Sequence, residues 1–197
     1  MNRKTPRGAS KAPLVKRAAA RGPLRIRDAT DADMPAIRAI YAHHVTHGFG
    51  SFEEIPPDLA EMVRRRQDVL VRGLPYLVAT DREARVLGFS YASPYRLRTA
   101  YRYTVEDSIY VAPEAIGRGI GARLLKVLIT RTTKLGYRQM IAVIGDSGNR
   151  GSIHVHASQG FRNAAVMRGI GFKLGRWVDS VLMQRPLGPG SGRKPRR

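Results

Sequence analysis

Residues 105–129, Val105-Glu-Asp-Ser-Ile-Tyr-Val-Ala-Pro-Glu-Ala-Ile-Gly-Arg-Gly-Ile-Gly-Ala-Arg-Leu-Leu-Lys-Val-Leu-Ile129, decide the fold. Residues 105–111 alternate between two faces as a β-strand does, with Asp107 on the same side as three apolar residues. A turn containing Gly117, Gly119 and Gly121 follows, and apolar residues then recur at helical spacing. Free N–H groups converge at such a helix start, and the helix dipole favours negative charge there. The stretch therefore predicts a phosphate-bearing ligand at residues 117–122.

Length and composition favour one domain. A chain of 197 residues can bury a substantial core. No apolar run approaches the roughly 20 residues of a membrane span, so we expect a soluble protein with no membrane partner. The absence of cysteine excludes disulfides, thiolate metal sites and a cysteine nucleophile, and it fits a reducing, cytoplasmic location.

The net charge of +20 is concentrated at the two ends of the chain. Residues 1–25 carry eight basic and no acidic side chains, and residues 193–197 carry four basic side chains. We expect disordered basic tails at residues 1–23 and 188–197 and a folded domain at residues 24–187. Contact of the tails with nucleic acid remains open, as does a targeting function for the first tail.

Periodicity and turn residues predict the elements between the tails. A short strand at 24–27 precedes a helix that starts at Thr30 or Asp31 and ends near His47. A second helix spans about 57–72, and a hairpin joins strands 76–80 and 86–92. After the glycine turn, Gly136 ends the helix. A buried, parallel strand at 139–144, a helix at 153–159 preceded by an N-cap at Ser152, and two strands ending near 184 complete the domain.

Three other sequence patterns are compared with known ligand sites. Gly117-x-Gly119-x-x-Ala122 matches the dinucleotide fingerprint, but residues 130–145 hold no acid and the glycines do not follow the first strand. No Lys-Ser or Lys-Thr pair completes a phosphate-binding loop of the Walker type. His43 and His47 have the spacing of metal ligands on a helix, but no third ligand is near, so we expect no metal.

The order of elements resembles the GCN5-related N-acetyltransferase superfamily. Its glycine turn corresponds to Ile116-Gly-Arg-Gly-Ile-Gly121, with Ile116 where the superfamily usually has Arg or Gln. Several blocks narrow the resemblance to the phosphinothricin/methionine sulfoximine acetyltransferase family: Ser51-Phe-Glu-Glu54, Tyr91–Arg96, Ala100–Val111, Ile141–Gly145 and Gly171–Trp177. The resemblance implies an α/β (α+β) acetyltransferase fold. It has a mixed sheet of six to seven strands, about four flanking helices, and splayed central parallel strands that form the cofactor cleft.

The resemblance also implies roles for individual residues. Glu106 matches the catalytic glutamate, which as a general base removes a proton from the amine. His156 stands where the superfamily often has a tyrosine that protonates the thiolate. His156 could act as an acid, position other groups or have no part in the reaction, and the sequence leaves these three roles open. Acetyl-CoA is the implied co-substrate, and its expected contacts are Ile109, Tyr110, Val111, Gly117, Arg118, Gly119, Ile120, Gly121, Ala122 and Asn149.

The implied acceptor is a small amino acid or analogue. Because the chain has no cysteine to carry an acyl group, we expect the acetyl group to pass directly from acetyl-CoA to this acceptor. Its carboxylate calls for a cation with forked donors, and Arg98 stands at the position that faces substrate in the family. The other expected acceptor contacts are Phe52, Tyr101, Ile144 and Gly145. Leu174 leaves the side-chain preference open. Family members are commonly dimers, so we expect a homodimer. There are two alternatives. The acceptor could be a polyamine, an aminoglycoside or a protein amine, or the protein could associate with nucleic acid through its tails.

Overall fold

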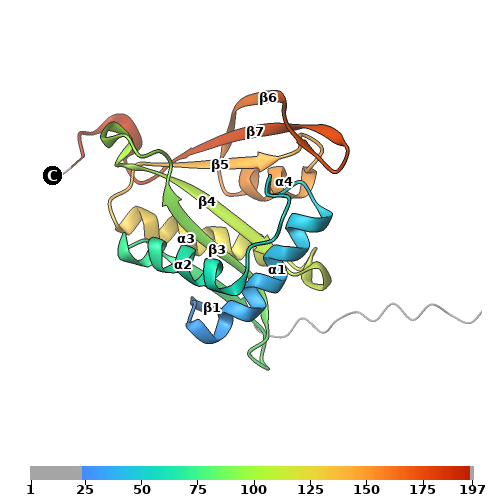
Figure 1. The fold of residues 1–197 in the computed structure, drawn as a ribbon. Helices are drawn as coiled ribbons and strands as arrows, with labels where there is room; N and C mark the ends of the chain where they lie inside the picture. The colour runs from blue at the N-terminus through green and yellow to red at the C-terminus, as the bar shows by residue number, and fades with distance from the viewer. Residues whose placement is uncertain (1–23, 196–197) are drawn as a thin grey trace, which may run out of the picture.

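A computed structural model describes residues 24–195, which form one mixed sheet with helices on both faces (Figure 1). The sheet has the order β1-β2-β3-β4-β5-β7-β6. The strands are β1 (Arg25–Asp28), β2 (Tyr76–Thr80), β3 (Val86–Pro94), β4 (Thr104–Val111), β5 (Gln139–Gly145), β6 (Arg162–Lys173) and β7 (Arg176–Pro186). The helices are α1 (Met34–His47), α2 (Leu59–Val71), α3 (Ile120–Lys134) and α4 (Arg150–Ser158), with short 3-10 turns η1 (Asp31–Asp33), η2 (Thr99–Tyr101), η3 (Pro113–Ala115) and η4 (Gly190–Gly192).

The two faces of the sheet carry different helices (Figure 1). A Cβ on Gly88 would lie 3.4 Å from Ile120 of α3, so this side of β3 lies against α3. Phe89 points to the opposite side and stacks on Tyr110 of β4, and Tyr110 packs edge-on against Tyr41 of α1. The helices α1 and α2 therefore cover one face, and α3 and α4 cover the other. Even-numbered residues of β4 point toward α1, and odd-numbered ones point toward α3 and α4.

The sheet splits at its only parallel pair in the described residues. β4 and β5 are in register from Thr104↔Gln139 to Asp107↔Ala142, and no pairing follows although both strands continue. Ala112 donates its N–H to Leu87, which fixes the even-numbered main-chain groups of β4 toward β3. The main-chain groups of Ile109 and Val111 therefore face the gap. The expected fold class, with its mixed sheet and splayed parallel strands, is confirmed.

Two expectations are corrected by the described residues. Helix α4 begins at Arg150 because the Asn149 side chain, and not that of Ser152, is the N-cap; its Oδ1 accepts the Ser152 N–H at 3.1 Å. The chain after residue 187 also differs from the expected tail. Leu187 and Gly190 are buried, and Gly190 donates to the Leu187 carbonyl as η4 begins. Residues 1–23, expected to be a tail, lie outside the described residues. No helix between residues 24 and 195 is long and apolar enough to cross a membrane.

Candidate active site

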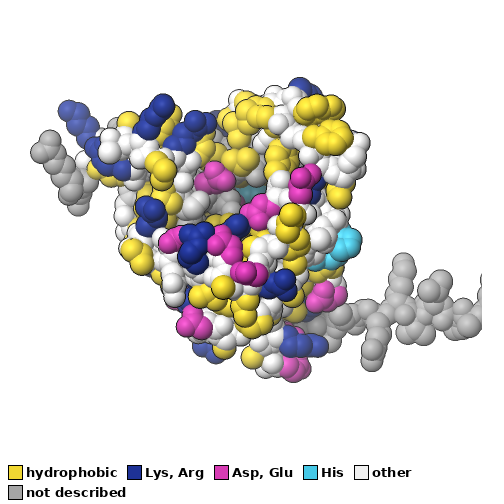
Figure 2. Space-filling view, in the orientation of Figure 1, with side chains coloured by type: hydrophobic (Ala, Val, Ile, Leu, Met, Phe, Trp, Pro, Cys, Tyr) yellow, Lys and Arg dark blue, Asp and Glu magenta, His cyan; other side chains and the backbone are white. Residues whose placement is uncertain are grey.

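A cavity of about 880 Å³ occupies the gap between β4 and β5. Figure 2 shows this side of the molecule hollowed below the cluster of hydrophobic side chains over β6 and β7. Most of the residues that the sequence predicts for the site line this cavity: Phe52, Glu106, Ile109–Val111, Gly117, Gly119–Ala122, Ile144, Gly145, Asn149 and His156. The structure thus brings together parts of the chain that are separated by more than one hundred residues.

Three of the predicted residues are not part of the cavity lining. Arg98 precedes the turn η2, and Tyr101 ends it; Tyr101 is 37% exposed and packs edge-on against Tyr95. This segment loops away between β3 and β4, and its position follows from tertiary structure that local sequence does not encode. Arg118 lies in the glycine turn, where it is half-buried. Neither Arg98 nor Tyr101 therefore lines the cavity that Glu106 lines.

The glycine turn presents free main-chain donors to the cavity. Gly117 and Gly119 have φ of 80° and 74°, a region that glycine enters without steric cost, and no atom lies within 4 Å of a Cβ added to either. Among the described residues, no hydrogen bond is donated by the N–H groups of residues 117–122. Helix α3 has 15 residues, and its dipole adds positive potential at the same point. These groups fit a phosphate or pyrophosphate.

The exposed edge of β4 continues the site from the turn toward Glu106. The main-chain groups of Ile109 and Val111 have no partner strand in β5. His44 of α1 donates its Nε2–H to the Val111 carbonyl at 2.8 Å, which leaves the Val111 N–H facing the gap. Burial lowers the pKa of His44 despite this bond. Sequence reasoning placed His44 only at the end of a helix, and no local pattern signals its contact with β4.

Glu106 lies on the α1 side of β4, at the inner end of the cavity. Its side chain is partly buried, and burial together with the neighbouring Asp107 charge raises its pKa from 4.5 to about 7. A carboxyl group with this pKa is half ionised near neutral pH, so it can accept a proton and release it again.

Asp107 points to the other face of β4 and forms a buried ion pair with His156 of α4. The His156 Nε2 lies 2.9 Å from the Asp107 Oδ2, and its Nδ1 lies 2.8 Å from the Ser152 carbonyl oxygen. Both partners accept, so both ring nitrogens donate and the ring is an imidazolium. Burial alone would lower the pKa of His156, but the hydrogen bond and charge of Asp107 outweigh it and raise the pKa.

This pairing narrows the roles left open for His156. Because both of its N–H groups are occupied by Asp107 and Ser152, the geometry favours a positioning role over direct proton delivery. Sequence reasoning did not include Asp107 among the site residues. Asp107 lies on the apolar side of an alternating strand, and this position could have identified it as a site residue because a buried acid needs a partner.

The histidines at the end of α1 contact one another and neighbouring groups of the helix. The His43 and His47 rings stack at 4.7 Å, and the His47 Nδ1 lies 2.6 Å from the Thr46 Oγ1 and 3.2 Å from the His43 carbonyl oxygen. Within residues 24–195, no group of three or more His, Asp or Glu side chains could hold a metal ion.

Comparisons with known proteins agree with this geometry. The sequence model of the acetyltransferase (GNAT) family matches residues 37–161. The chain is 55% identical over 170 residues, 86% of each chain, to the phosphinothricin N-acetyltransferase of Alcaligenes faecalis. It is 40% identical to the L-methionine sulfoximine/L-methionine sulfone acetyltransferase of Pseudomonas aeruginosa over 83% of this chain and 95% of that one.

Solved structures agree as well. The GNAT superfamily phosphinothricin acetyltransferase of Sinorhizobium meliloti, solved in complex with AcCoA, superposes with a TM-score of 0.86 and 48% identity. The match covers 88% of this chain and 94% of that protein. The glycine turn, the split between β4 and β5, and the extent of these matches lead to one conclusion: this chain belongs to the acetyltransferase (GNAT) family.

Proposed function

We propose that this protein transfers an acetyl group from acetyl-CoA to the α-amino group of a small amino acid or analogue of the methionine sulfoximine, methionine sulfone and phosphinothricin class. The observation that carries the proposal is the position of Glu106, whose pKa of about 7 suits a general base, at the inner end of a cavity that also contains a phosphate-binding turn. The activities for which the relatives are named supply the substrate class.

The residues of the cavity fit acetyl-CoA. The free N–H groups of residues 117–122 suit its pyrophosphate, and Arg118 can add a charge contact from the rim. The gap-facing main-chain groups of Ile109 and Val111, together with Tyr110 and Asn149 in the lining, suit the amide-bearing arm. Acetyl-CoA supplies an activated thioester. Ile116, 64% exposed at the turn, provides no charge where the superfamily usually has one.

The chemistry then divides between two parts of β4. The Glu106 carboxylate accepts a proton from the ammonium group, which frees the nitrogen lone pair. The Val111 N–H faces the gap and can polarise the thioester carbonyl. The nitrogen bonds to the carbonyl carbon, the carbon–sulfur bond breaks, and the departing thiolate takes up the second proton that the nitrogen loses as the amide forms. Direct transfer needs no acyl-enzyme, in keeping with a chain that has no cysteine.

Acceptor contacts are proposed at Phe52, Ile144 and Gly145, which line the inner part of the cavity. Arg98 and Tyr101 stay candidates for the substrate carboxylate only if their segment is brought toward the cavity when substrate binds. We also propose a cytoplasmic homodimer. The aromatic side chains of Phe172 and Trp177 are 57% and 67% exposed, a composition typical of protein interfaces. Sedimentation of the protein at several concentrations tests the dimer.

The function is tested by mixing the protein with acetyl-CoA and a panel of acceptors and following thiol release. The panel holds methionine sulfone, methionine sulfoximine, phosphinothricin, a polyamine and an aminoglycoside. We expect release with the first three; release with only the cationic acceptors would refute the proposed class. Glu106→Gln should lower turnover by about 10²–10⁴-fold, the usual scale for loss of a general base. Near-wild-type turnover would remove Glu106 from this role.

The nucleic-acid hypothesis rests on both basic tails, of which residues 1–23 lie outside the described residues, and the first tail has its own test. Retention on DNA that falls steeply with salt is expected of tail-driven binding. Removing residues 1–23 should abolish retention and leave acetylation intact. Unchanged retention after this removal would contradict binding through that tail.

A further inference from the structure

A strap formed by residues 49–53, Phe49-Gly-Ser-Phe-Glu53, crosses the α1 side of the cavity. Gly50, Ser51 and Phe52 of the strap line the cavity together with Glu106. Residues on both sides of the split sheet hold the strap. On one side are α1 and α2, and on the other are β5, β6 and β7.

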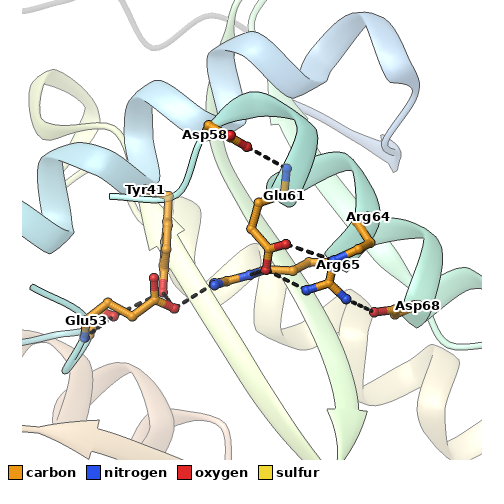
Figure 3. Close-up of polar contacts among 8 residues, drawn as sticks. Tyr41, Glu53, Asp58, Glu61, Arg64, Arg65 and Asp68 are labelled. Atoms are coloured by element: carbon orange, nitrogen blue, oxygen red, sulfur yellow. Dashed lines mark hydrogen bonds and ion pairs between the residues drawn. The ribbon is translucent and has the colours of Figure 1, made fainter. Parts of the chain in front are cut away.

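Arg65 of α2 holds the C-terminal end of the strap. Figure 3 shows its side chain reaching Glu53, whose Oε1 accepts from Arg65 at 2.6 Å. The same oxygen accepts from the Tyr41 hydroxyl of α1 at 3.0 Å, and this hydroxyl also lies 3.0 Å from the Ser51 Oγ. Glu61 of α2 accepts from the Arg65 Nε at 2.7 Å, which aims the guanidinium at the strap. One carboxylate therefore ties the strap to two helices.

Lys173 of β6 holds the strap from the other side. It is 3% exposed, and its Nζ donates to the Ser51 carbonyl at 2.6 Å. A buried ammonium group is costly unless it is bonded, so this contact is a specific one. The strap also requires two glycines of the sheet: a Cβ on Gly145 would lie 1.7 Å from the Phe49 carbonyl oxygen, and one on Gly171 would lie 2.5 Å from the Phe52 ring.

These contacts set the place of Phe52. Its ring lies against Gly171 and forms an apolar wall of the cavity with Met167 and Ile170 of β6. The wall lies on the side where Glu106 receives the amine. A shift of the strap by about 1 Å would change the space beside Glu106 but not the glycine turn, which lies on the α3 side.

We propose that Arg65 and Lys173 are positioning residues for the acceptor: by fastening the strap from opposite sides of the split sheet, they hold Phe52 where it forms the acceptor pocket. The inference rests on the proposed function and deepens it. Neither residue lines the cavity, so each acts through the strap. An apolar wall held in this way suits the unbranched methylene part of the acceptor side chain.

Arg64 provides a matched control for Arg65. The two arginines are neighbours on α2 and both pair with Glu61, but Arg64 otherwise reaches Asp68 and does not contact the strap (Figure 3). We expect Arg65→Met and Lys173→Met to raise the KM for methionine sulfone by about 10–100-fold, the scale of a roughly 1 Å misplacement. The KM for acetyl-CoA should stay within about twofold, and Arg64→Met should change neither.

Hydrogen exchange of residues 49–53 gives a second readout that does not depend on the acceptor. It should rise in Arg65→Met and Lys173→Met and stay unchanged in Arg64→Met. Glu53→Gln, which weakens the same contact from the strap side, replaces Arg65→Met if that variant does not fold.

Three results would overturn the proposal: equal acceptor KM values in the Arg65 and Arg64 variants, a parallel rise in both KM values, or unchanged exchange in the strap. If the wild-type protein acetylates no amino acid, the proposed function fails by itself. The exchange experiment then decides whether the strap is held as described.

Discussion

Replacing His156 by Gln should move the acid limb of the pH–rate profile to higher pH, and replacing Asp107 by Asn should move it to lower pH. On the proposed mechanism the acid limb reports ionisation of Glu106, which immediately precedes Asp107 in β4 and is influenced by its charge. In the wild-type protein the Asp107 charge is balanced by the His156 imidazolium. Removing the imidazolium leaves an unbalanced negative charge beside Glu106, whereas removing the carboxylate takes that charge away.

The expected size follows from the causes of the Glu106 pKa. The value of about 7, compared with 4.5, arises first from burial and second from Asp107. Asp107→Asn should therefore lower the midpoint by about one pH unit or less, and His156→Gln should raise it by about the same amount. At pH 6, where about a tenth of wild-type Glu106 is ionised, His156→Gln should lose up to tenfold more activity.

The other titratable groups near Glu106 are unchanged by these substitutions. They are Tyr91 of β3 and the Glu53–Arg65 pair beside the strap. Their effects are common to all variants, so the difference between the two midpoints isolates the ion pair.

The assay is kcat/KM for methionine sulfone from pH 5.5 to 9, with thermal unfolding recorded at each pH. Breaking a buried pair costs about 3–5 kcal/mol, so the single variants should melt at lower temperature. Because the pKa of folded His156 is raised above 6.5, the stability from the pair is fully present below that pH and is lost as pH rises through the folded value. Midpoints that shift in the same direction in both variants, or not at all, would refute the reasoning.

Three further predictions concern other parts of the molecule. Gly119→Ala should raise the KM for acetyl-CoA at least several-fold, because the φ of 74° and the open surroundings of Gly119 place a Cβ in the proposed phosphate site. Gly73→Ala is the control: Gly73 has a φ of 69° at the end of α2, so this variant should lose similar stability without a change in that KM. Equal KM values would contradict a ligand at the turn. Ile116→Arg should lower the KM for acetyl-CoA several-fold at low salt, since it adds a charge at the exposed rim; no change in titration calorimetry would count against pyrophosphate there. Asp33→Asn should destabilise the fold by about 1–2 kcal/mol, because Arg27 and the Thr30 N–H lower the pKa of Asp33 to about 2. The stability that the Asp33 carboxylate contributes is present above about pH 4 and is lost as pH falls toward 2. Denaturant unfolding at about pH 7 and about pH 2.5 measures this difference.

The sequence alone determined the local elements of the site. The alternation of residues 105–111, the glycines of the turn and the apolar spacing of α3 each act over a few residues, so their geometry can be read from neighbouring positions. The hairpin at 81–85 and the helix end at Gly136, with its φ of 90°, were predicted for the same reason. These local signals led to the predicted phosphate site at the turn, whereas the fold and the role of Glu106 were implied by the resemblance to the acetyltransferase family.

Only the tertiary structure decided how the site is completed. His156 meets Asp107 across 49 residues, and Lys173 meets Ser51 across 122 residues. The segment with Arg98 and Tyr101 loops outside the cavity lining, although resemblance placed both residues there. A contact between distant segments leaves no periodic pattern near either partner, because each side chain is selected by a neighbour that local sequence does not contain. The strand, turn and helix could therefore be predicted, whereas the ion pair behind Glu106 and the strap in front of it could not.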